Sequence, residues 1–495
     1  MRKIHISFLL VISILFAFSS CKKNEPFNQT KYVNDWIYEQ MSTYYFWNTK
    51  IPTAPDYTFA SDKFFGSLLY KYNKATAPDG DRFSWIDKDY KNLLAGLSGV
   101  SSAEIGFDYI GVRTPIQDQF YLLVTYPKKG TDAYTKGLKR GDFVVKINGL
   151  DITASNANEL IGGTGTRVLG IANWVYNPST NEEELKYTKD ITVMMHSNFA
   201  ENPIYLDTIY NINGKNIGYL VYHFFARDKG DGSHSYDKDL MSKMQQFQSR
   251  GVSEMVLDFR YNSGGAVSTA IGLASALVKD RTSNKIFGIA EYNSVLQSEL
   301  KKYFKNDKFN IDYFVDKMMD STAVVAAVPA LNLQRVYVLT GKYTASASEL
   351  IINGLKPHMD VVLVGDTTYG KNVGSVSLYE EDDPKNTWGL QPIVVKYYNA
   401  ANKSDYTAGF NPNFAIDELE ELDLVDFGDT SDPLLRKALT EIAGPLPASA
   451  VKRYNRIIGA TPERQPFQLD VKKKLLPLID DKRERVIRQI EKVNN

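Results

Sequence analysis

Cysteine is almost absent from this chain: Cys21 is the only one in 495 residues. From residue 22 onward, internal disulfides, cysteine nucleophiles and thiolate metal sites are therefore excluded. Histidine is scarce too, with five residues. The four that lie beyond the first twenty residues show neither an HExxH motif nor the clustering of a zinc site (His196, His223, His234 and His358). A metal centre is not expected, and no motif requires a cofactor.

Charge of one sign is not in excess either, since Lys plus Arg and Asp plus Glu both number 58. This balance gives no reason to expect nucleic acid or an acidic partner. After the first twenty residues, no apolar run approaches the ~20 residues that span a bilayer. With 43% hydrophobic and 23% charged residues, the composition is that of a globular chain long enough for about two to four domains.

Residues 1–20 have the pattern of a bacterial export signal. A basic start at Arg2 and Lys3 precedes an apolar stretch, and two serines come just before Cys21. Cys21 is therefore a candidate lipidation site at the head of a polar linker, residues 21–30. We expect a lipoprotein of the bacterial cell envelope, held at the outer membrane through Cys21 and facing the periplasm or the cell surface. A plain secretory signal with an incidental cysteine is the alternative.

Hydrophobic periodicity divides the rest of the chain into four parts. Residues 31–96 carry apolar side chains at helical spacing and predict a small helical domain. Residues 97–200 read as strands and predict a β-rich domain. Residues 201–445 alternate strands and helices, which indicates an α/β sandwich with functional loops at the strand ends. Within them, residues 282–329 form an insertion that either covers the site or is a surface excursion. Residues 446–495 end in a charged helix, so the expected fold is mixed α/β and multidomain.

One serine and one lysine stand out in the α/β region. Ser346 lies between two alanines, just ahead of an apolar run that predicts a helix, and Lys371 follows a short apolar strand in a Tyr-Gly-Lys turn. A serine hydroxyl becomes a nucleophile when a neighbouring base removes its proton, and a lysine is such a base when burial lowers its pKa. Ser346 and Lys371 are thus a candidate nucleophile and general base. The plain alternative is a helix-start serine and a solvated loop lysine.

A glycine pair adds a third element. An apolar strand over residues 256–259 ends in a polar break, and Gly264 and Gly265 follow in a turn whose backbone N–H groups can face an anion. This turn is a candidate oxyanion hole. An ordinary strand-to-helix loop is the alternative.

Taken together and in this order, the segments DFRYNSGG, TASASE and DTTYGK resemble the signature segments of the C-terminal processing proteases, also called tail-specific proteases. The resemblance extends over roughly residues 204–440. It implies a serine peptidase with a Ser/Lys dyad, in which Ser346 is the nucleophile and Lys371 the general base.

The same resemblance implies further roles around the dyad. The N–H of Ala347, together with that of Gly264 or Gly265, would hold the oxyanion. Many family members carry a glutamine four residues after the lysine to orient its amine. This chain has Ser375 at that position, so Ser375 is a possible third member of the catalytic group, beside Ser346 and Lys371. Glu349 matches a family glutamate and is interpreted as helix-terminus electrostatics.

The segment GLKRGDFVVKINGLDI resembles the central strands of a PDZ domain, which family members carry between the helical lead and the catalytic core. This resemblance implies that a peptide adds as a strand along an exposed edge. Its terminal carboxylate would be bound by N–H groups of the loop at Ile105, Gly106 and Phe107. A β domain that only packs against the core is the alternative.

The expected activity is that of a serine endopeptidase of the cell envelope, acting on proteins or peptides. Two alternatives are open. A Ser-His-Asp triad could use His223 or His358 as its base, and a non-catalytic envelope lipoprotein could bind peptides without cutting them.

Overall fold

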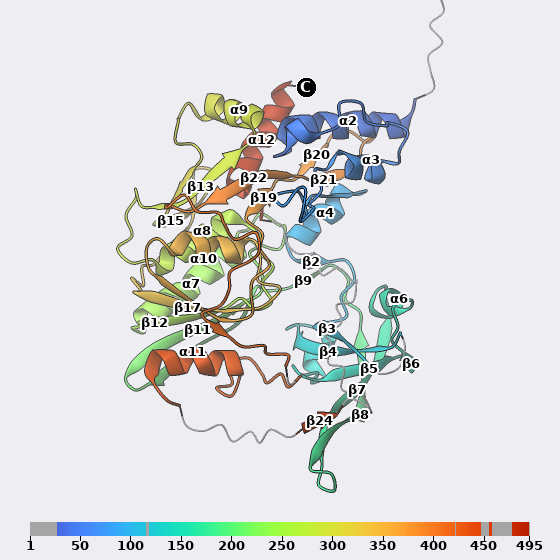
Figure 1. The fold of residues 1–495 in the computed structure, drawn as a ribbon, viewed down its shortest axis with the longest axis vertical. Helices are drawn as coiled ribbons and strands as arrows, with labels where there is room; N and C mark the ends of the chain where they lie inside the picture. Colours follow the sequence, from blue (N-terminus) through green and yellow to red (C-terminus); the bar gives the residue numbers. More distant parts are fainter. Residues whose placement is uncertain (1–26, 115–117, 421, 447–454, 458–477, 495) are drawn as a thin grey trace, which may run out of the picture.

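The computed structural model describes residues 27–114, 118–420, 422–446, 455–457 and 478–494, and its architecture is mixed α/β (Figure 1). The predicted export signal and Cys21 lie outside the described residues. Within them, no helix is both long and apolar enough to cross a membrane.

A six-stranded sheet is the centre of the molecule. Its order is β10-β11-β12-β17-β18-β23, and all strands but β10 run parallel. Helices α7, α8 and α10 cover one face and α11 covers the other (Figure 1). The elements of these layers are β10 (Ile204–Ile212), β11 (Lys215–Tyr222), α7 (Ser235–Ser249), β12 (Glu254–Asp258), α8 (Val267–Leu277), β17 (Arg335–Thr340), α10 (Ala347–Leu355), β18 (Asp360–Gly365), β23 (Phe414–Ala415) and α11 (Pro433–Ala443). Because both faces are covered, the middle residues of the central strands are mostly apolar, as those of parallel strands usually are.

A second sheet of four antiparallel strands, ordered β14-β13-β22-β19, lies on the far side of α8 and α10 (Figure 1). The predicted insertion supplies much of this layer, and Met318 packs on Gly272 of α8. Its elements and their neighbours are β13 (Ile286–Tyr292), α9 (Ser294–Phe304), β14 (Ile311–Tyr313), β15 (Lys317–Asp320), β16 (Ala323–Ala327), β19 (Val373–Ser375), β20 (Leu378–Tyr379), β21 (Gly389–Gln391) and β22 (Ile393–Tyr398). The segment therefore forms part of the packed structure over the helices.

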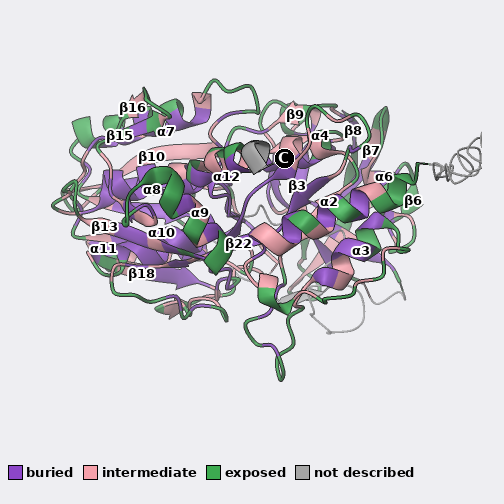
Figure 2. Ribbon diagram, turned by 90° about the horizontal axis from the view of Figure 1, so that it is seen from above, coloured by how far each residue is buried: buried purple, intermediate pink, exposed green. Residues whose placement is uncertain are grey.

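The N-terminal helices sit on top of the second sheet (Figure 1). The N-terminal region comprises the helices α2 (Gln29–Tyr44), η1 (Asn48–Lys50), α3 (Ser61–Leu68) and α4 (Tyr90–Leu97) and the short strand β1 (Trp85–Asp87). Helix α2 has one buried and one exposed face (Figure 2), and its buried side chains share a hydrophobic cluster with the central layers. Strand β1 pairs with β21. This pairing brings the chain around residue 82 down to the loop that contains Lys371.

The β-rich region has its own hydrophobic core. It comprises β2 (Val100–Ser101), β3 (Phe107–Arg113), β4 (Phe120–Pro127), α5 (Asp132–Thr135), β5 (Phe143–Ile147), β6 (Leu150–Asp151), α6 (Ala157–Ile161), β7 (Thr166–Asn177), β8 (Glu182–Met194) and β9 (Phe199–Ala200). Its main sheet has the order β24-β8-β7-β5-β4-β3, where β24 is Asn455–Ile457. No strand among the described residues pairs with the outer edge of β3.

The C-terminal helix α12 (Asp481–Asn494) returns to the top of the molecule, near α9 (Figure 1). Its charge pattern predicts a helix with a solvated surface, but the side chains of Arg483 and Ile487 are buried.

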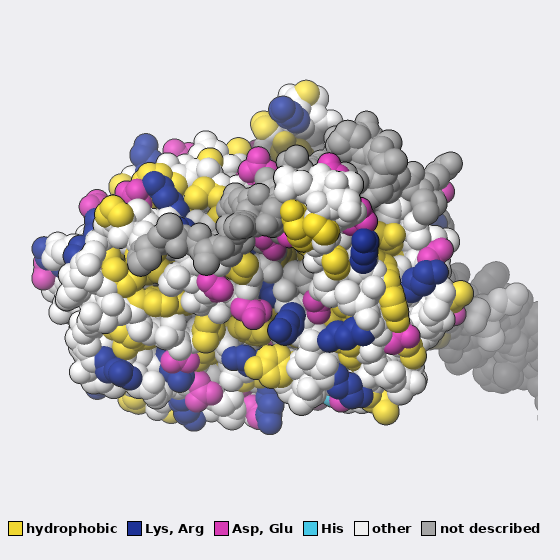
Figure 3. Space-filling view, turned by 90° about the horizontal axis from the view of Figure 1, so that it is seen from below, with side chains coloured by type: hydrophobic (Ala, Val, Ile, Leu, Met, Phe, Trp, Pro, Cys, Tyr) yellow, Lys and Arg dark blue, Asp and Glu magenta, His cyan; other side chains and the backbone are white. Residues whose placement is uncertain are grey.

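On the described surface that is seen from below, Lys and Arg side chains alternate with Asp and Glu (Figure 3). No large area of one sign is seen on that face, as the equal charge counts predict.

Candidate active site

Ser346 is held in an unusual backbone conformation at the start of α10. Its φ is 62° and its ψ is −115°, a region that residues with a side chain rarely adopt. The residue is fully buried, and among the described residues its Oγ has no hydrogen-bond partner. Strained backbone and an unsatisfied buried hydroxyl both carry a free-energy cost, and such features concentrate at functional sites.

Lys371 lies in the loop after β18 and is 2% exposed. Its Nζ sits 4.9 Å from the centre of the Phe83 ring, a cation–π distance. Burial lowers the pKa of Lys371 to about 7, while Asp81 and Glu349 oppose this shift and Arg82 adds to it. A large fraction of the amine is therefore neutral near pH 7, as a general base requires.

Glu349 connects these two residues. Its Oε2 accepts the backbone N–H of Ser346 at 2.9 Å and the backbone N–H of Lys371 at 2.7 Å. Its Oε1 accepts the N–H of Gly370 at 2.7 Å and the hydroxyl of Thr368 at 2.6 Å. One fully buried carboxylate thus positions the backbone of both candidate catalytic residues. Its role is larger than the helix-terminus electrostatics inferred from the sequence.

The hydrogen bond between the Ser346 hydroxyl and the Lys371 amine is not formed in this conformation, since the Oγ has no partner among the described residues. The backbones of the two residues are nevertheless bound to the same oxygen atom. Catalytic hydrogen bonds are often long or absent before substrate binds. The structure therefore brings the pair together through Glu349, with the amine directed at Phe83.

The glycine turn lies directly against Ser346. A methyl group at Gly264 would stand 2.4 Å from Ser346 Cβ and 3.0 Å from the backbone nitrogen of Ala347. Only glycine leaves room for this approach, at a φ of 114°. The Gly264 N–H donates to Asn262 Oδ1 at 2.9 Å. Of the three predicted oxyanion donors, this one already has a partner, which favours Gly265 and Ala347 for the role.

Two residues at this site were not expected from the sequence. The Arg82 guanidinium donates to the carbonyl oxygens of Gly370 at 2.8 Å and Thr407 at 3.1 Å, and it also stacks on Phe83. Arg82 is separated from these two partners by 288 and 325 residues in the sequence. No local sequence pattern could therefore predict the contacts. Arg82 and Phe83 form the wall that shields the Lys371 side chain from water.

Ser375, the possible third member, is buried in β19. Its hydroxyl donates to the Leu478 carbonyl oxygen at 3.3 Å and accepts from Gln391 at 2.9 Å. Both contacts lead away from Lys371. The structure gives Ser375 a place in the packing of the C-terminal segment.

The two histidines of the alternative triad have other partners. His223 Nδ1 lies 3.1 Å from Glu201 Oε1, and its ring stacks on Tyr126. His358 Nε2 lies 2.7 Å from the Ile286 carbonyl oxygen, beyond the far end of α10, a helix of about 13 Å. Neither ring hydrogen-bonds Ser346, so the geometry offers no support for a histidine base.

The residues of the predicted peptide-binding loop already have partners within the chain. The side chains of Ile105 and Phe107 are buried in the core of the β-rich region. The Gly106 N–H donates to Glu104 Oε1 at 2.8 Å, and Glu104 pairs with Lys128. The N–H that we expected to bind a peptide carboxylate thus binds a carboxylate of the chain itself.

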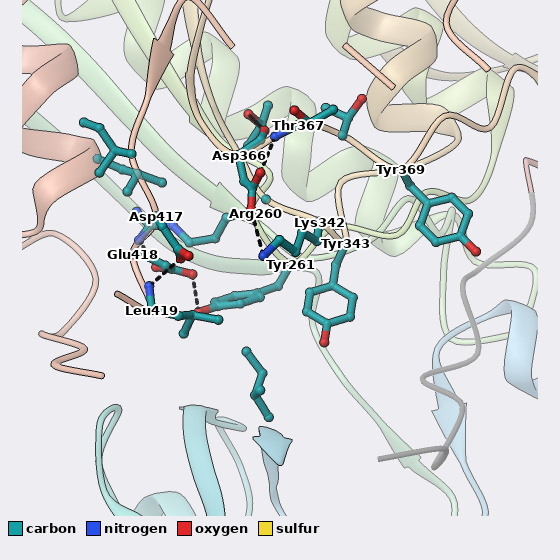
Figure 4. Close-up of a pocket in the computed structure, with 16 residues that line it drawn as sticks. Arg260, Tyr261, Lys342, Tyr343, Asp366, Thr367, Tyr369, Asp417, Glu418 and Leu419 are labelled. Carbon is teal, nitrogen blue, oxygen red and sulfur yellow. Dashed lines mark hydrogen bonds and ion pairs between the residues drawn. The ribbon is translucent and has the colours of Figure 1, made fainter. Parts of the chain in front are cut away.

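A cavity of about 390 Å³ opens beside the candidate site (Figure 4). Its walls come from the loops after β17 and β18, including Tyr343 and Tyr369, and from Ile110 on β3. The ion pair of Lys342 with Asp366, at 3.2 Å, lies on one side. The cavity therefore lies between Ile110 of β3 and the loops that carry Ser346 and Lys371, and neither of these two residues lines it.

Comparison with known proteins adds independent findings. The family model described as peptidase family S41 matches residues 216–416, and that of the peptidase S41 N-terminal domain matches residues 32–85. A carboxyl-terminal-processing protease of the bacterium Picosynechococcus is 23% identical over 385 residues, which cover 76% of this chain and 81% of the relative. The carboxy-terminal processing protease CtpA of Bacillus subtilis is 25% identical over 312 residues, which cover 62% of this chain and 55% of that protein.

A solved structure assigned to the S41 proteases, from Bacteroides fragilis, superposes on this chain with a TM-score of 0.68 at 29% identity. The match covers 83% of this chain and 97% of the other. The mixed α/β fold of most of this chain is therefore found in a related chain of known structure. Among the described residues, no group of three His, Cys, Asp or Glu side chains could hold a metal ion.

Proposed function

The chain belongs to peptidase family S41, the carboxyl-terminal-processing serine peptidases, and from this premise we propose that it is an endopeptidase with Ser346 as nucleophile and Lys371 as general base. The observation that carries the proposal is the Glu349 carboxylate, which binds the backbone N–H of both residues. The burial of Lys371, which lowers its pKa to about 7, supports the same roles.

The proposed reaction is acyl transfer. Ser346 Oγ attacks the carbonyl carbon of the scissile peptide bond, and the neutral Lys371 amine takes the hydroxyl proton. The amine then gives this proton to the departing amine of the substrate, and water hydrolyses the acyl-enzyme. Before the first step, Lys371 Nζ must turn from Phe83 toward Ser346, which the flexible stem of a lysine permits.

The oxyanion is assigned to backbone donors. The Ala347 N–H lies at the amino terminus of α10, where the helix dipole favours negative charge. The Gly265 N–H is the second donor in this proposal, because the Gly264 N–H is engaged by Asn262.

Substrate capture is assigned to the β-rich region as a PDZ-like module. An extended peptide would add to the free edge of β3. The cavity next to Ile110 would then lead it toward Ser346. A substrate carboxylate would have to displace the Glu104 carboxylate, which accepts the hydrogen bond of the Gly106 N–H in this structure. Glu104→Ala should therefore tighten the binding of peptides with a free C-terminus, measured by fluorescence anisotropy, and an unchanged affinity would contradict this assignment.

Location in the cell envelope, with a lipid on Cys21, is part of the proposal and rests on the sequence pattern of the first 21 residues. Metabolic labelling with a fatty acid should mark the wild-type chain and not Cys21→Ala. Equal labelling of the two would contradict lipidation at this residue.

The test of the function is cleavage of an unfolded protein, with products identified by mass spectrometry. We expect the wild-type chain to produce internal fragments and Ser346→Ala to produce none. Lys371→Met should be as inactive as Ser346→Ala, while His223→Ala and His358→Ala should keep most of the activity. A histidine variant that is inactive although folded, beside an active Lys371→Met, would reject the dyad.

A further inference from the structure

The C-terminal segment of the chain passes between the glycine turn and the strand that follows the lysine. The Ile479 N–H donates to the Gly265 carbonyl oxygen at 3.0 Å, and the Val267 N–H donates to the Ile479 carbonyl oxygen at 3.0 Å. On the other side, the Ser375 N–H donates to the Leu478 carbonyl oxygen at 2.8 Å, and the Asp480 N–H donates to the Ser375 carbonyl oxygen at 3.1 Å. Residues 478–480 thus form a strand-like bridge between two catalytic loops.

The next residue of the bridge caps the helix behind the glycine turn. Helix α8 begins at Val267, and its own N-cap residue, Ala266, has no side chain that could accept a hydrogen bond. Asp481 supplies the missing acceptor: its Oδ1 accepts the Ser268 N–H at 3.0 Å, and it also hydrogen-bonds the Ser268 hydroxyl. The cap comes from a residue 213 positions away, so it connects the start of α8 to the C-terminal segment.

A buried ionic cluster holds the bridge in place. Asp480 is fully buried, lies 3.2 Å from Arg483 and hydrogen-bonds Tyr292. Arg483 in turn contacts Asp312 at 3.1 Å. Charges in the interior are stable only when they are paired in this way. The bridge is therefore fixed at one end by this cluster and at the other by the glycine turn.

The contacts matter because the bridge holds the carbonyl group of Gly265, whereas other residues hold its neighbours. The Gly264 N–H donates to Asn262 Oδ1 at 2.9 Å, and the Phe225 N–H donates to the Gly264 carbonyl oxygen at 2.7 Å. Gly265 has a φ of 133°, in a region open mainly to glycine, and the N–H of the next residue, Ala266, donates to the Phe225 carbonyl oxygen at 2.7 Å. Without the bridge, the Gly265 carbonyl, the Val267 N–H and both backbone groups of Ser375 lose buried partners. A glycine turn with free carbonyl groups can rotate its peptide planes. Because the peptide plane of the Gly265 carbonyl and the one that carries the Gly265 N–H meet at the Cα of Gly265, such a rotation would also disturb the direction of the Gly265 N–H.

We propose that residues 478–481 are a positioning element, which holds the Gly265 N–H in the orientation that binds the oxyanion and keeps the glycine turn in register with β19. This inference rests on the proposed function, since it assigns a purpose to the oxyanion donor. It makes the last part of the chain necessary for catalysis although it contributes no group to the reaction.

The test uses full-length variants of the bridge. Ile479→Pro removes the N–H that donates to the Gly265 carbonyl oxygen. The bridge can accommodate this change because a proline favours an extended conformation of the residue before it. Asp481→Ala removes the cap on Ser268, while Asp481→Asn keeps an acceptor oxygen there. We expect Ile479→Pro and Asp481→Ala to lower kcat about 10- to 100-fold, as partial loss of an oxyanion donor does, with KM nearly unchanged. Asp481→Asn should restore most of kcat.

A second readout separates positioning from mere stability. A peptide aldehyde forms a tetrahedral adduct with the serine and needs the oxyanion donors, whereas the corresponding peptide alcohol does not. In the bridge variants, the affinity for the aldehyde should fall in parallel with kcat, whereas the affinity for the alcohol should stay at the wild-type value. The acid limb of the pH profile should stay at the wild-type position, because Lys371 does not contact the bridge.

Arg485→Ala is the matched control, since Arg485 lies on α12 and pairs with Asp320, away from both catalytic loops. It should retain wild-type kcat. If folded Ile479→Pro and Asp481→Ala both keep wild-type kcat and aldehyde affinity, the inference is wrong. Should Ile479→Pro fail to fold, Asp481→Ala decides alone. If cleavage is lost in Ser346→Ala but stays at the wild-type level in the bridge variants, only this inference is rejected. If cleavage persists in Ser346→Ala, the proposed function is rejected.

Discussion

At the scale of single residues, the proposed catalysis depends on the protonation state of Lys371. Burial lowers its pKa to about 7, so the amine is protonated below that pH and neutral above it. Only the neutral form can take the proton of Ser346. We expect kcat/KM for a fluorogenic peptide to rise with pH through about 7 and then to level off. A rate that is flat from pH 5 to pH 9 would contradict the assignment of the base.

Phe83 is the side chain that shields this amine. Phe83→Ala should admit water around Nζ and raise the pKa of Lys371 toward its ordinary value of 10.5. The acid limb of the pH profile should then move up by about one pH unit, with a smaller effect at pH 9 than at pH 7. Phe59→Ala, an exposed ring of the same region, is the control. A uniform loss of rate at every pH would mean that Phe83 acts only through stability.

Glu349 is the residue whose removal should affect both catalysis and folding. In Glu349→Gln, an amide NH2 group replaces one of the two oxygens that together accept four hydrogen bonds. At least one buried donor then loses its partner, which costs about 1–3 kcal/mol of unfolding free energy. We expect this loss in urea unfolding, and a kcat at least about tenfold lower because the two catalytic backbones separate. The exposed pair of Glu299 with Lys302 provides the control Glu299→Gln, and equal behaviour of the two variants would contradict the role.

At the scale of elements, the close approach of the glycine turn to α10 gives a steric prediction. Gly264→Ala places a methyl group 2.4 Å from Ser346 Cβ, which forces the turn and the helix start apart. Activity should fall by about 100-fold or more, while circular dichroism stays that of a folded chain. Gly96→Ala in α4, where a methyl group has open space, should be neutral. An active Gly264→Ala would show that the site tolerates separation of the two elements.

The elements of the sandwich could largely be predicted, because their signals are local. The apolar pattern of residues 267–277 predicts a helix, and α8 has these bounds. That of residues 336–339 predicts a strand, which lies within β17. The pattern of residues 217–225 also predicts a strand, but this strand ends at Tyr222, since Phe225 leaves β11 to pair with Gly265. Hydrophobicity continues past the end of that strand, and only the tertiary contact shows where it stops.

The proposed catalytic pair and the glycine turn could be singled out from sequence, because each sits in a short motif at a strand end, and their roles stay predictions. The Glu349 pattern, a serine followed three residues later by a glutamate, announces a helix start, but its hydrogen bonds to Gly370 and Lys371 cross from one loop to another. Residue spacing contains no information on that crossing. The same is true of Arg82 and Phe83, which reach the lysine from the N-terminal helices.

At the scale of the whole molecule, three distant parts of the chain converge on one site. The N-terminal region shields the lysine through Arg82 and Phe83. The C-terminal bridge joins the glycine turn to β19 through Ile479. The β-rich region presents the free edge of β3 beside the cavity. The sandwich alone therefore contains the proposed reacting groups, but their environment is built by the rest of the chain.

The most direct measurement is labelling by a fluorophosphonate probe at pH 8, with the modified residue mapped by mass spectrometry. Such a probe reacts with a serine only when its hydroxyl is activated. We expect one labelled residue, Ser346, in the wild-type chain and loss of labelling in a folded Lys371→Met variant. Labelling of Ser346 that persists at the wild-type rate in Lys371→Met, or a wild-type chain that stays unlabelled, would contradict the dyad.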